Sequence, residues 1–191
     1  MSELEELFFT PIDRSIFQSR MVMIYGPVNS HLAYEVNRQL MALESVDSNK
    51  PIYLMINSPG GEITSGFSIY DTARFIKPEI YTIVTGLAAS MGSLIALCAK
   101  KENRLSFPNA KFLIHQPLIS GVIQGQASDL AIHARDIVKT KEKINKLYAL
   151  ETGKPLDKVT EMTDRDNWMD AQEAKEFGLI SRIIQDRSEL K

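Results

Sequence analysis

Cysteine is almost absent from this sequence, which contains only Cys98 among its 191 residues. A single cysteine excludes an intrachain disulfide, and the lack of a disulfide framework fits a protein of the reducing cytosol. Cys98 lies in an apolar run, where cysteines are usually buried and unreactive, so we do not consider it a nucleophile. We therefore expect a cytoplasmic protein whose chemistry does not involve its thiol.

Histidine and long apolar runs are also scarce. The three histidines, His31, His115 and His133, are far apart and lack the spacing of metal ligands. No apolar run approaches the roughly 20 residues of a membrane span, and the acidic start of the chain is unlike a signal peptide. We therefore expect neither a metal site nor a membrane segment.

Charge of one sign is not in excess, since the formal net charge is −2. This balance gives no reason to expect nucleic-acid binding. Lys100, Lys101 and Arg104 are too few for a basic patch, and we expect them to lie in a solvated loop.

The sequence does contain alternating strand and helix patterns, which are typical of an α/β fold. No internal repeat or low-complexity linker divides it, so we expect a single domain over residues 1–191. The elements expected in the first half are strands over 21–25, 52–56 and 81–84, and helices from residue 30 and over 63–76 and 91–99.

Ser90 is the first candidate for chemistry. It follows two alanines and precedes Met91 and Gly92, at the junction of an expected strand and an expected helix. Such a junction can lift a hydroxyl above the end of a sheet and direct a helix N-terminus at a bound group. A small packed residue or a helix cap is the alternative interpretation.

Two other segments contain the partners that a serine nucleophile needs. His115 ends an apolar run, and the polar segment 163–168 contains Asp164 and Asp166. In acyl transfer, a serine attacks, an imidazole takes its proton and later donates it, and a carboxylate orients the imidazole. The spacing leaves open whether these groups meet, and a solvated turn is the alternative for the acids.

A fourth segment, residues 57–61 with the sequence NSPGG, follows an expected strand. Paired glycines permit positive φ and close backbone approach, so amide groups there can point into a site as oxyanion-hole donors do. An ordinary strand-to-helix turn is the alternative.

These segments together resemble the proteolytic subunits of the Clp protease family. The resemblance runs from about Arg20 to Ile184. It rests on the motifs at 57–61, 88–92, 115–117, 165–166, 173–174 and 177–179.

The resemblance implies a ClpP/crotonase-like fold, with a repeated β-β-α core, and a serine endopeptidase that hydrolyses unfolded proteins and peptides. It implies Ser90 as the nucleophile, His115 as the general base and acid, and Asp166 as the orienting acid. It also implies that the backbone amides of Gly61 and Met91 form the oxyanion hole.

The same resemblance implies an assembly of two stacked seven-membered rings, with Asp164 and Arg165 in the contacts between rings. The implied partner is an AAA+ unfoldase that uses ATP and supplies unfolded substrate, while this chain binds no cofactor. A paralogous ring is a further candidate partner.

A long helix is predicted over residues 128–152, capped by Ser128 and ended by Gly153. At 1.5 Å per residue it would extend about 35–40 Å, longer than a small core needs. We expect it to protrude and to bury its apolar face against another molecule, and a helix lying across its own sheet is the alternative. In the family this is the handle, which here corresponds to residues 118–153.

The sequence departs from the family pattern in three places. The run 118–124, which we expect to pair with substrate as a strand, is two residues longer than usual. Ala131 replaces an acid often found early in the handle, and residues 1–19 diverge from the usual N-terminal axial segment.

Two alternatives to an active peptidase remain. The first is a weakly active or regulatory subunit that complements an active paralogous ring. The second is a crotonase-type acyl-CoA enzyme, which would hold an enolate with backbone amides but gives no role to Ser90, His115 and Asp166.

Overall fold

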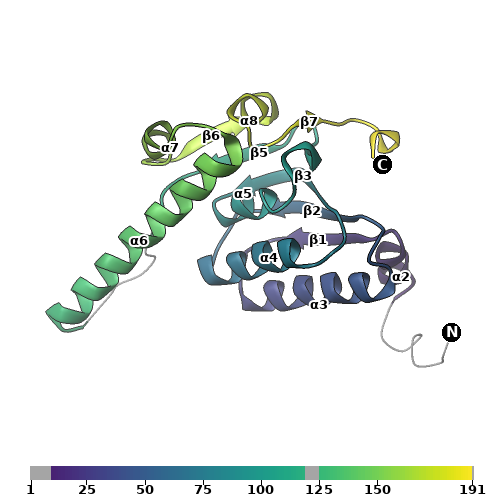
Figure 1. Cartoon of the computed structure of the whole chain (residues 1–191), viewed down its shortest axis with the longest axis horizontal. Coiled ribbons are helices and arrows are strands. Elements are labelled where there is room, and N and C mark those ends of the chain that lie inside the picture. The colour runs from purple at the N-terminus through teal and green to yellow at the C-terminus, as the bar shows by residue number, and fades with distance from the viewer. Residues whose placement is uncertain (1–9, 119–124, 191) are drawn as a thin grey trace.

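The computed structural model describes residues 10–118 and 125–190 and has an α/β fold built on one mostly parallel sheet (Figure 1). Five strands form the parallel path of the sheet, and two more branch from the end of β3, where β5 pairs parallel with β3 and β6 pairs antiparallel with β5. In sheet order the path is β1 (Met21–Tyr25), β2 (Ile52–Ser58), β3 (Ile80–Ala89), β4 (Arg104–Ser106) and β7 (Arg182–Ile183), and the branch is β5 (Lys111–Ile114) and β6 (Asn167–Asp170).

Helices α3, α4 and α5 lie side by side along the sheet, while α7 and α8 lie beside the β5–β6 branch (Figure 1). The helices are α2 (Pro11–Gln18), α3 (Ser30–Val46), α4 (Ile63–Phe75), α5 (Met91–Ala96), α6 (Ala127–Thr152), α7 (Leu156–Met162) and α8 (Ala171–Phe177), with short 3-10 turns η1 (Lys101–Asn103) and η2 (Arg187–Glu189). None of the described helices is both long and apolar enough to cross a membrane.

Local sequence signals explain several of these boundaries. Asn29 caps α3, because its side-chain oxygen accepts the N–H of Leu32 at 2.9 Å. Asp170 and Glu173 form a reciprocal capping box at the start of α8, with bonds of 2.8 and 2.9 Å. Gly178 ends α8 in the left-handed region, at φ 101. The predicted strand–helix alternation is confirmed.

Several predicted boundaries were wrong. Strand β2 continues to Ser58, two residues beyond its predicted end at Ile56. Strand β3 continues to Ala89 instead of ending at Val84, because its later residues pair with Ser58 of β2 and with β5. Helix α5 ends at Ala96, three residues before the predicted end, with Leu97 as its C-cap.

The described part of the N-terminal segment contains a helix that was not expected, α2. Thr10 accepts the N–H of Asp13 at 3.2 Å, and the Asp13 carboxylate accepts the N–H of Thr10 at 3.3 Å. Pro11 occupies the first helical position, where its missing N–H costs nothing. The remainder of the divergent segment, residues 1–9, lies outside the described residues.

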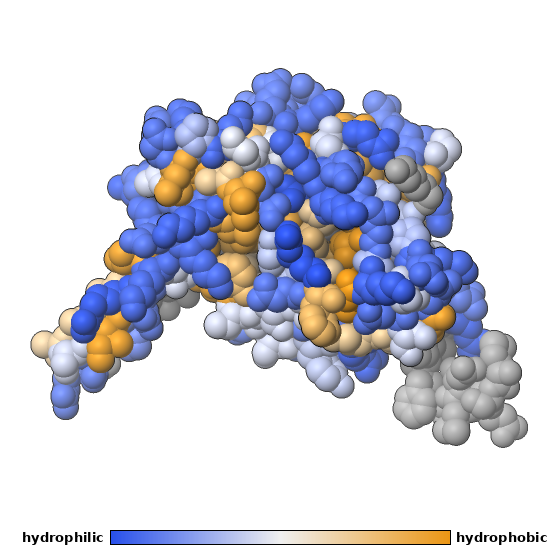
Figure 2. Space-filling model, in the orientation of Figure 1, coloured by the Kyte–Doolittle hydropathy of each residue, from blue (hydrophilic) through white to orange (hydrophobic). Residues whose placement is uncertain are grey.

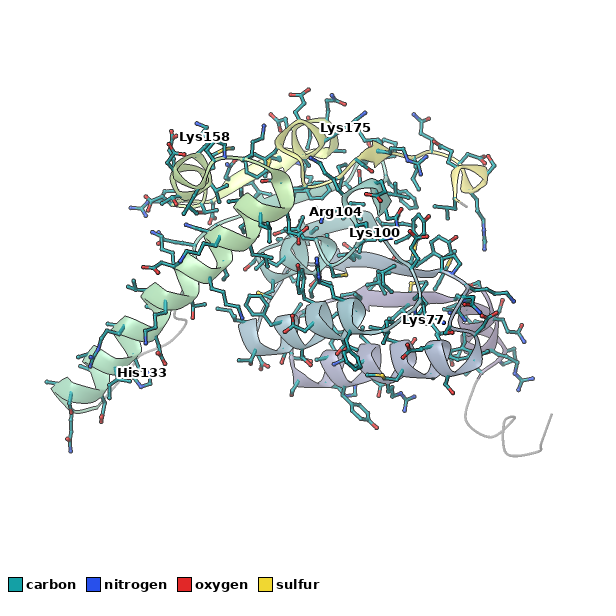
Figure 3. All side chains as sticks on the ribbon, viewed as in Figure 1. Lys77, Lys100, Arg104, His133, Lys158 and Lys175 are labelled. Carbon is teal, nitrogen blue, oxygen red and sulfur yellow. The ribbon has the colours of Figure 1, made fainter. Side chains whose placement is uncertain are left out.

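Helix α6 leaves the body of the molecule and projects away from the sheet (Figure 1). All of its buried residues lie in its C-terminal half, whereas Leu130 and Ile132, in the projecting half, are 41% and 50% exposed. Figure 2 shows both polar and apolar side chains on the projecting part, and Figure 3 places His133 there. These observations confirm a protruding helix and not one that lies across its own sheet.

The ends of α6 agree only in part with the prediction. Gly153 ends it in the left-handed region, at φ 77, as predicted. The helix begins at Ala127 with Gln126 as N-cap and no capping side-chain bond, so the predicted cap at Ser128 was wrong. Of the predicted substrate strand 118–124, residues 119–124 lie outside the described residues.

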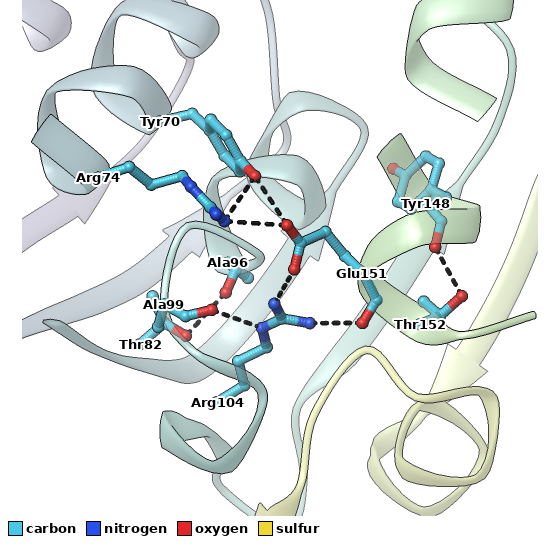
Figure 4. Close-up of polar contacts among 9 residues, drawn as sticks. All are labelled: Tyr70, Arg74, Thr82, Ala96, Ala99, Arg104, Tyr148, Glu151 and Thr152. Carbon is cyan, nitrogen blue, oxygen red and sulfur yellow. Dashed lines mark hydrogen bonds and ion pairs between the residues drawn. The ribbon is translucent and has the colours of Figure 1, made fainter. Parts of the chain in front are cut away.

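Arg104 does not lie in a solvated loop, so this prediction was wrong. It starts β4, is 1% exposed and lies inside the body of the molecule (Figure 3). Its guanidinium donates to the carbonyl oxygens of Ala99 and Glu151, each at 2.9 Å, and forms an ion pair with the Glu151 carboxylate (Figure 4). Lys100 and Lys101 are exposed, as expected.

The Glu151 carboxylate joins α6 to α4 as well. It accepts from Arg74 at 2.9 Å and from the Tyr70 hydroxyl at 3.1 Å (Figure 4). Burial, reinforced by the negative charge of Glu151, raises the pKa of Tyr70 to about 12. Burial likewise raises the pKa of the Cys98 thiol to about 12, which agrees with its expected lack of reactivity.

Candidate active site

A cavity of about 680 Å³ lies where β2, β3 and β5 end and α6 joins the body. It is lined by the loop after β2, the turn between β3 and α5, the residues that follow β5, and the base of α6. Gly61, Ser90, Met91 and His115 all line it. The structure thus brings four of the predicted site residues, which span 55 positions of the sequence, around one space.

Ser90 occupies a strained turn between β3 and α5. Its φ of 53° and ψ of −122° lie in a region that residues other than glycine rarely adopt. Its N–H donates to the Leu113 carbonyl at 2.9 Å, which ties the turn to β5. Ser90 is the N-cap of α5, yet its side chain makes no capping hydrogen bond. No partner for this hydroxyl is found among residues 10–118 and 125–190, and the helix-cap interpretation is not supported.

The glycine pair packs directly against this turn. A Cβ on Gly60 would lie 2.6 Å from the Ala89 carbonyl oxygen and 2.7 Å from the Ser90 Cβ, so only glycine allows the approach. The φ of Gly60, 86°, also favours glycine.

Backbone pairing with Val28 orients the next residue, Gly61. Val28 donates to the Gly60 carbonyl and accepts from the Glu62 N–H, each at 2.8 Å. In such a parallel bridge the N–H of the middle residue points away from its partner, so the Gly61 amide does not engage Val28. Met91 is the first residue of α5, and its N–H is one of those without an intrahelical acceptor. Both residues line the cavity, and each has an amide that Val28 or helix α5 leaves without an acceptor.

His115 and Asp166 meet beside the cavity. The His115 Nδ1 lies 3.1 Å from Asp166 Oδ1, and the two side chains are 16% and 64% exposed. The register of the antiparallel pair β5–β6 explains the contact, because Ile114 pairs with Asn167 and the next residues outward are His115 and Asp166. A further bond, from the Gln116 N–H to the Thr163 carbonyl at 2.6 Å, holds the two segments together.

Asp164 and Arg165 point elsewhere. The Asp164 carbonyl accepts from the Gln116 side chain at 2.7 Å, and its carboxylate lies 3.6 Å from Lys141 Nζ. The Arg165 side chain is 85% exposed and lies 3.5 Å from the Asp164 carboxylate. Of the two acids, Asp166 is the one that contacts His115.

Among the described residues, no hydrogen bond joins Ser90 to His115, although both line the cavity. Two further polar residues at the site were missed in the sequence. Ser93 follows the Ser90 motif, and Tyr148 lies in the long helix predicted over 128–152. Their hydroxyls lie 2.7 Å apart beneath the Ser90 turn. No local pattern in the sequence indicates that Ser93 and Tyr148, which are 55 positions apart, are in contact.

Comparison with known proteins identifies the family of this chain. The model of the family described as Clp protease matches residues 5–187. The chain belongs to the Clp protease family. Membership of this family implies a peptidase that assembles from several subunits and works with a partner unfoldase.

Several curated relatives are nearly half identical to the chain. "ATP-dependent Clp protease proteolytic subunit 3" of Rhizobium etli is 47% identical over 178 residues, which cover 93% of this chain and 90% of the relative. Subunit 2 of Treponema pallidum is 46% identical over 186 residues, covering 97% and 90%. Subunit 1 of Protochlamydia amoebophila is 46% identical over 180 residues, covering 94% and 87%.

Proposed function

We propose that this chain is a serine endopeptidase in which Ser90 is the nucleophile, His115 the general base and acid, and Asp166 the residue that orients His115. The observation that carries the proposal is the 3.1 Å contact between His115 and Asp166 at the wall of the cavity that Ser90 also lines. The family match favours peptide hydrolysis over the crotonase-type acyl-CoA chemistry.

The contact with Asp166 assigns the proton of His115. A carboxylate only accepts, so Nδ1 carries the imidazole proton and donates a hydrogen bond to Asp166. The lone pair of Nε2 then remains to take the Ser90 proton as the hydroxyl attacks a peptide carbonyl. The resulting imidazolium is stabilised by the carboxylate and later donates its proton to the leaving amine. All of these groups come from the chain itself, so this step needs no cofactor.

The developing oxyanion would be held by the amides of Gly61 and Met91. Both residues line the cavity, and the bridge to Val28 fixes the direction of the Gly61 N–H. Loss of one such donor typically costs about 3–4 kcal/mol of barrier. The strained backbone of Ser90 supports its proposed role as the nucleophile, since strained turns present nucleophiles in other hydrolases.

We further propose that the active particle consists of two stacked seven-membered rings, and that an AAA+ unfoldase supplies unfolded chains to it. The projecting half of α6 supports this assembly, because its exposed apolar residues need a partner surface. Arg165, which is 85% exposed, is available for contacts between rings. The numbered subunit names of the relatives are also compatible with a regulatory subunit beside a paralogous ring, without favouring it.

The test of the proposal is Ser90→Ala, compared with Ser68→Ala, which removes an exposed hydroxyl from α4. We expect Ser90→Ala to assemble normally, because it removes one hydroxyl, and to lose several orders of magnitude in hydrolysis of a fluorogenic peptide. Ser68→Ala should retain wild-type turnover. Near wild-type turnover by Ser90→Ala would show that Ser90 is not the nucleophile.

A further inference from the structure

The hydroxyl of Tyr148 is a buried polar group that the proposed reaction does not use. Tyr148 lies at the base of α6 and is 1% exposed. Its hydroxyl lies 2.7 Å from the Ser93 hydroxyl, and burial raises its pKa well above the usual range. Tyr148 is therefore neutral near pH 7 and has one proton to donate.

Ser93 lies at the centre of a small hydrogen-bonding cluster under the nucleophile. Its Oγ lies 2.7 Å from the Ser90 carbonyl oxygen, 3.3 Å from the Leu113 carbonyl oxygen and 2.7 Å from the Tyr148 hydroxyl. Ser93 is 1% exposed, so water does not compete for these contacts. Its hydroxyl has only one proton to share among three oxygen neighbours.

Counting protons gives the direction of the bonds. The two carbonyl oxygens only accept, so the short contact with Ser90 requires that Ser93 donate to it. The proton of Tyr148 then points to the Ser93 oxygen. If Ser93 instead donated to Tyr148, the Ser90 carbonyl oxygen would face the Ser93 oxygen at 2.7 Å with no proton between them. The buried Tyr148 proton would then have no acceptor among the described residues. The bonds therefore run from Tyr148 to Ser93 to Ser90.

These two hydrogen bonds act on the strained backbone of Ser90. Ser90 has a φ of 53°, and a non-glycine residue keeps such a conformation only where its surroundings impose it. The Leu113 carbonyl holds the Ser90 N–H. The Ser90 carbonyl accepts the N–H groups of Ser93 and Leu94 at 3.0 and 3.3 Å, and its shortest bond, at 2.7 Å, comes from the Ser93 hydroxyl. Leu113 lies two residues before His115, so the same cluster adjoins both residues of the proposed proton transfer.

We propose that Tyr148 and Ser93 are positioning residues, which hold Ser90 in its reactive conformation through this directed pair of hydrogen bonds. The inference rests on the proposed function of Ser90. Tyr148 contributes through its hydroxyl, and Tyr148→Phe keeps the ring of this cavity-lining residue. Removal of the hydroxyl should therefore slow the chemical step and leave substrate binding nearly unchanged.

The test is Tyr148→Phe, with Tyr70→Phe as the matched control. Tyr70 is also a buried, hydrogen-bonded tyrosine on a helix, but it contacts Glu151 and Arg74 and does not line the cavity. For both variants, the assembled particles are first isolated by size-exclusion chromatography, and the measurements are made on them. The readouts are kcat and KM for a fluorogenic peptide, and the rate at which a fluorophosphonate labels Ser90.

We expect Tyr148→Phe to lower kcat and the labelling rate about tenfold, the equivalent of one hydrogen bond, with KM within about twofold of wild type. Tyr70→Phe should leave all three values unchanged. Ser93→Ala should lower kcat at least as much as Tyr148→Phe. The double variant should be no slower than Ser93→Ala alone, because the two hydroxyls act in series.

Three results would overturn the inference while leaving the proposed function intact. These are wild-type rates in Tyr148→Phe, a raised KM at constant kcat, or effects of the two substitutions that multiply. Failure of a fluorophosphonate to label wild-type Ser90 is a different outcome, since it would refute the proposed function and the inference with it.

Discussion

The buried ion pair between Arg104 and Glu151 makes a sharp prediction about stability. The two side chains are 2% and 11% exposed, so Glu151→Ala would leave the Arg104 charge buried without its counterion. Among the partners that the described part of the chain provides, the guanidinium would keep its bonds to the carbonyls of Ala99 and residue 151. Breaking a buried pair in this way typically costs about 3–5 kcal/mol. Tm falls by about 2–4 °C per kcal/mol for a chain of this size, so we expect Tm to decrease by roughly 10 °C.

The assay is thermal unfolding of the assembled protein, with Glu161→Ala as the control. Glu161 also pairs with a cation at 2.9 Å, but its side chain and that of Lys158 are 73% and 52% exposed. Such surface pairs contribute about 0–1 kcal/mol, so the control should lower Tm by at most a few degrees. Equal melting of the two variants would refute the conclusion that the network in Figure 4 stabilises the fold through a desolvated charge.

Three further predictions concern the site and the assembly. Asp166→Asn should lower kcat by on the order of 10⁴-fold in an intact particle, whereas Arg165→Ala should lose activity through dissociation of the rings; sedimentation separates the two effects. Gly61→Ala would press a Cβ against the Val28 carbonyl, and we expect peptide turnover to fall about 100-fold. Gly153→Ala is the control, because the space around Gly153 is open, and it should lower stability by only about 1 kcal/mol in a denaturant titration. The purified chain alone should be a poor peptidase whose turnover rises when a paralogous ring or an unfoldase is added, because a partner that binds only the aligned state raises its population; full turnover unchanged by either partner would contradict this.

Local signals in the sequence account for several helix ends of the fold. The cap at Asn29, the capping box of Asp170 and Glu173, and the glycines at 153 and 178 determine helix ends through bonds within a few residues. The later part of β3 has no such signal, since Thr-Gly-Leu-Ala-Ala is not a strand pattern. Its extended form comes from pairing with β2 and β5, which only the assembled sheet provides.

The candidate site was predictable as a set of residues but not as a geometry. His115 and Asp166 are 51 positions apart, and the register of β5 against β6 brings them together. Arg104 is buried because Glu151, 47 positions away, supplies its counterion. The Tyr148 hydroxyl meets Ser93 because the fold brings the base of α6 to the start of α5. Each of these contacts depends on tertiary packing that no local pattern reports.

The identity of the nucleophile is the central claim, and covalent labelling tests it most directly. The assembled protein is treated with a fluorophosphonate until peptide hydrolysis stops, and the modified residue is identified by peptide mass spectrometry. We predict a single adduct on Ser90, formed in proportion to the activity lost, because this hydroxyl lines the same cavity as His115, which contacts Asp166. Complete inactivation with the adduct on another residue, or hydrolysis that persists after Ser90 is fully modified, would contradict the account.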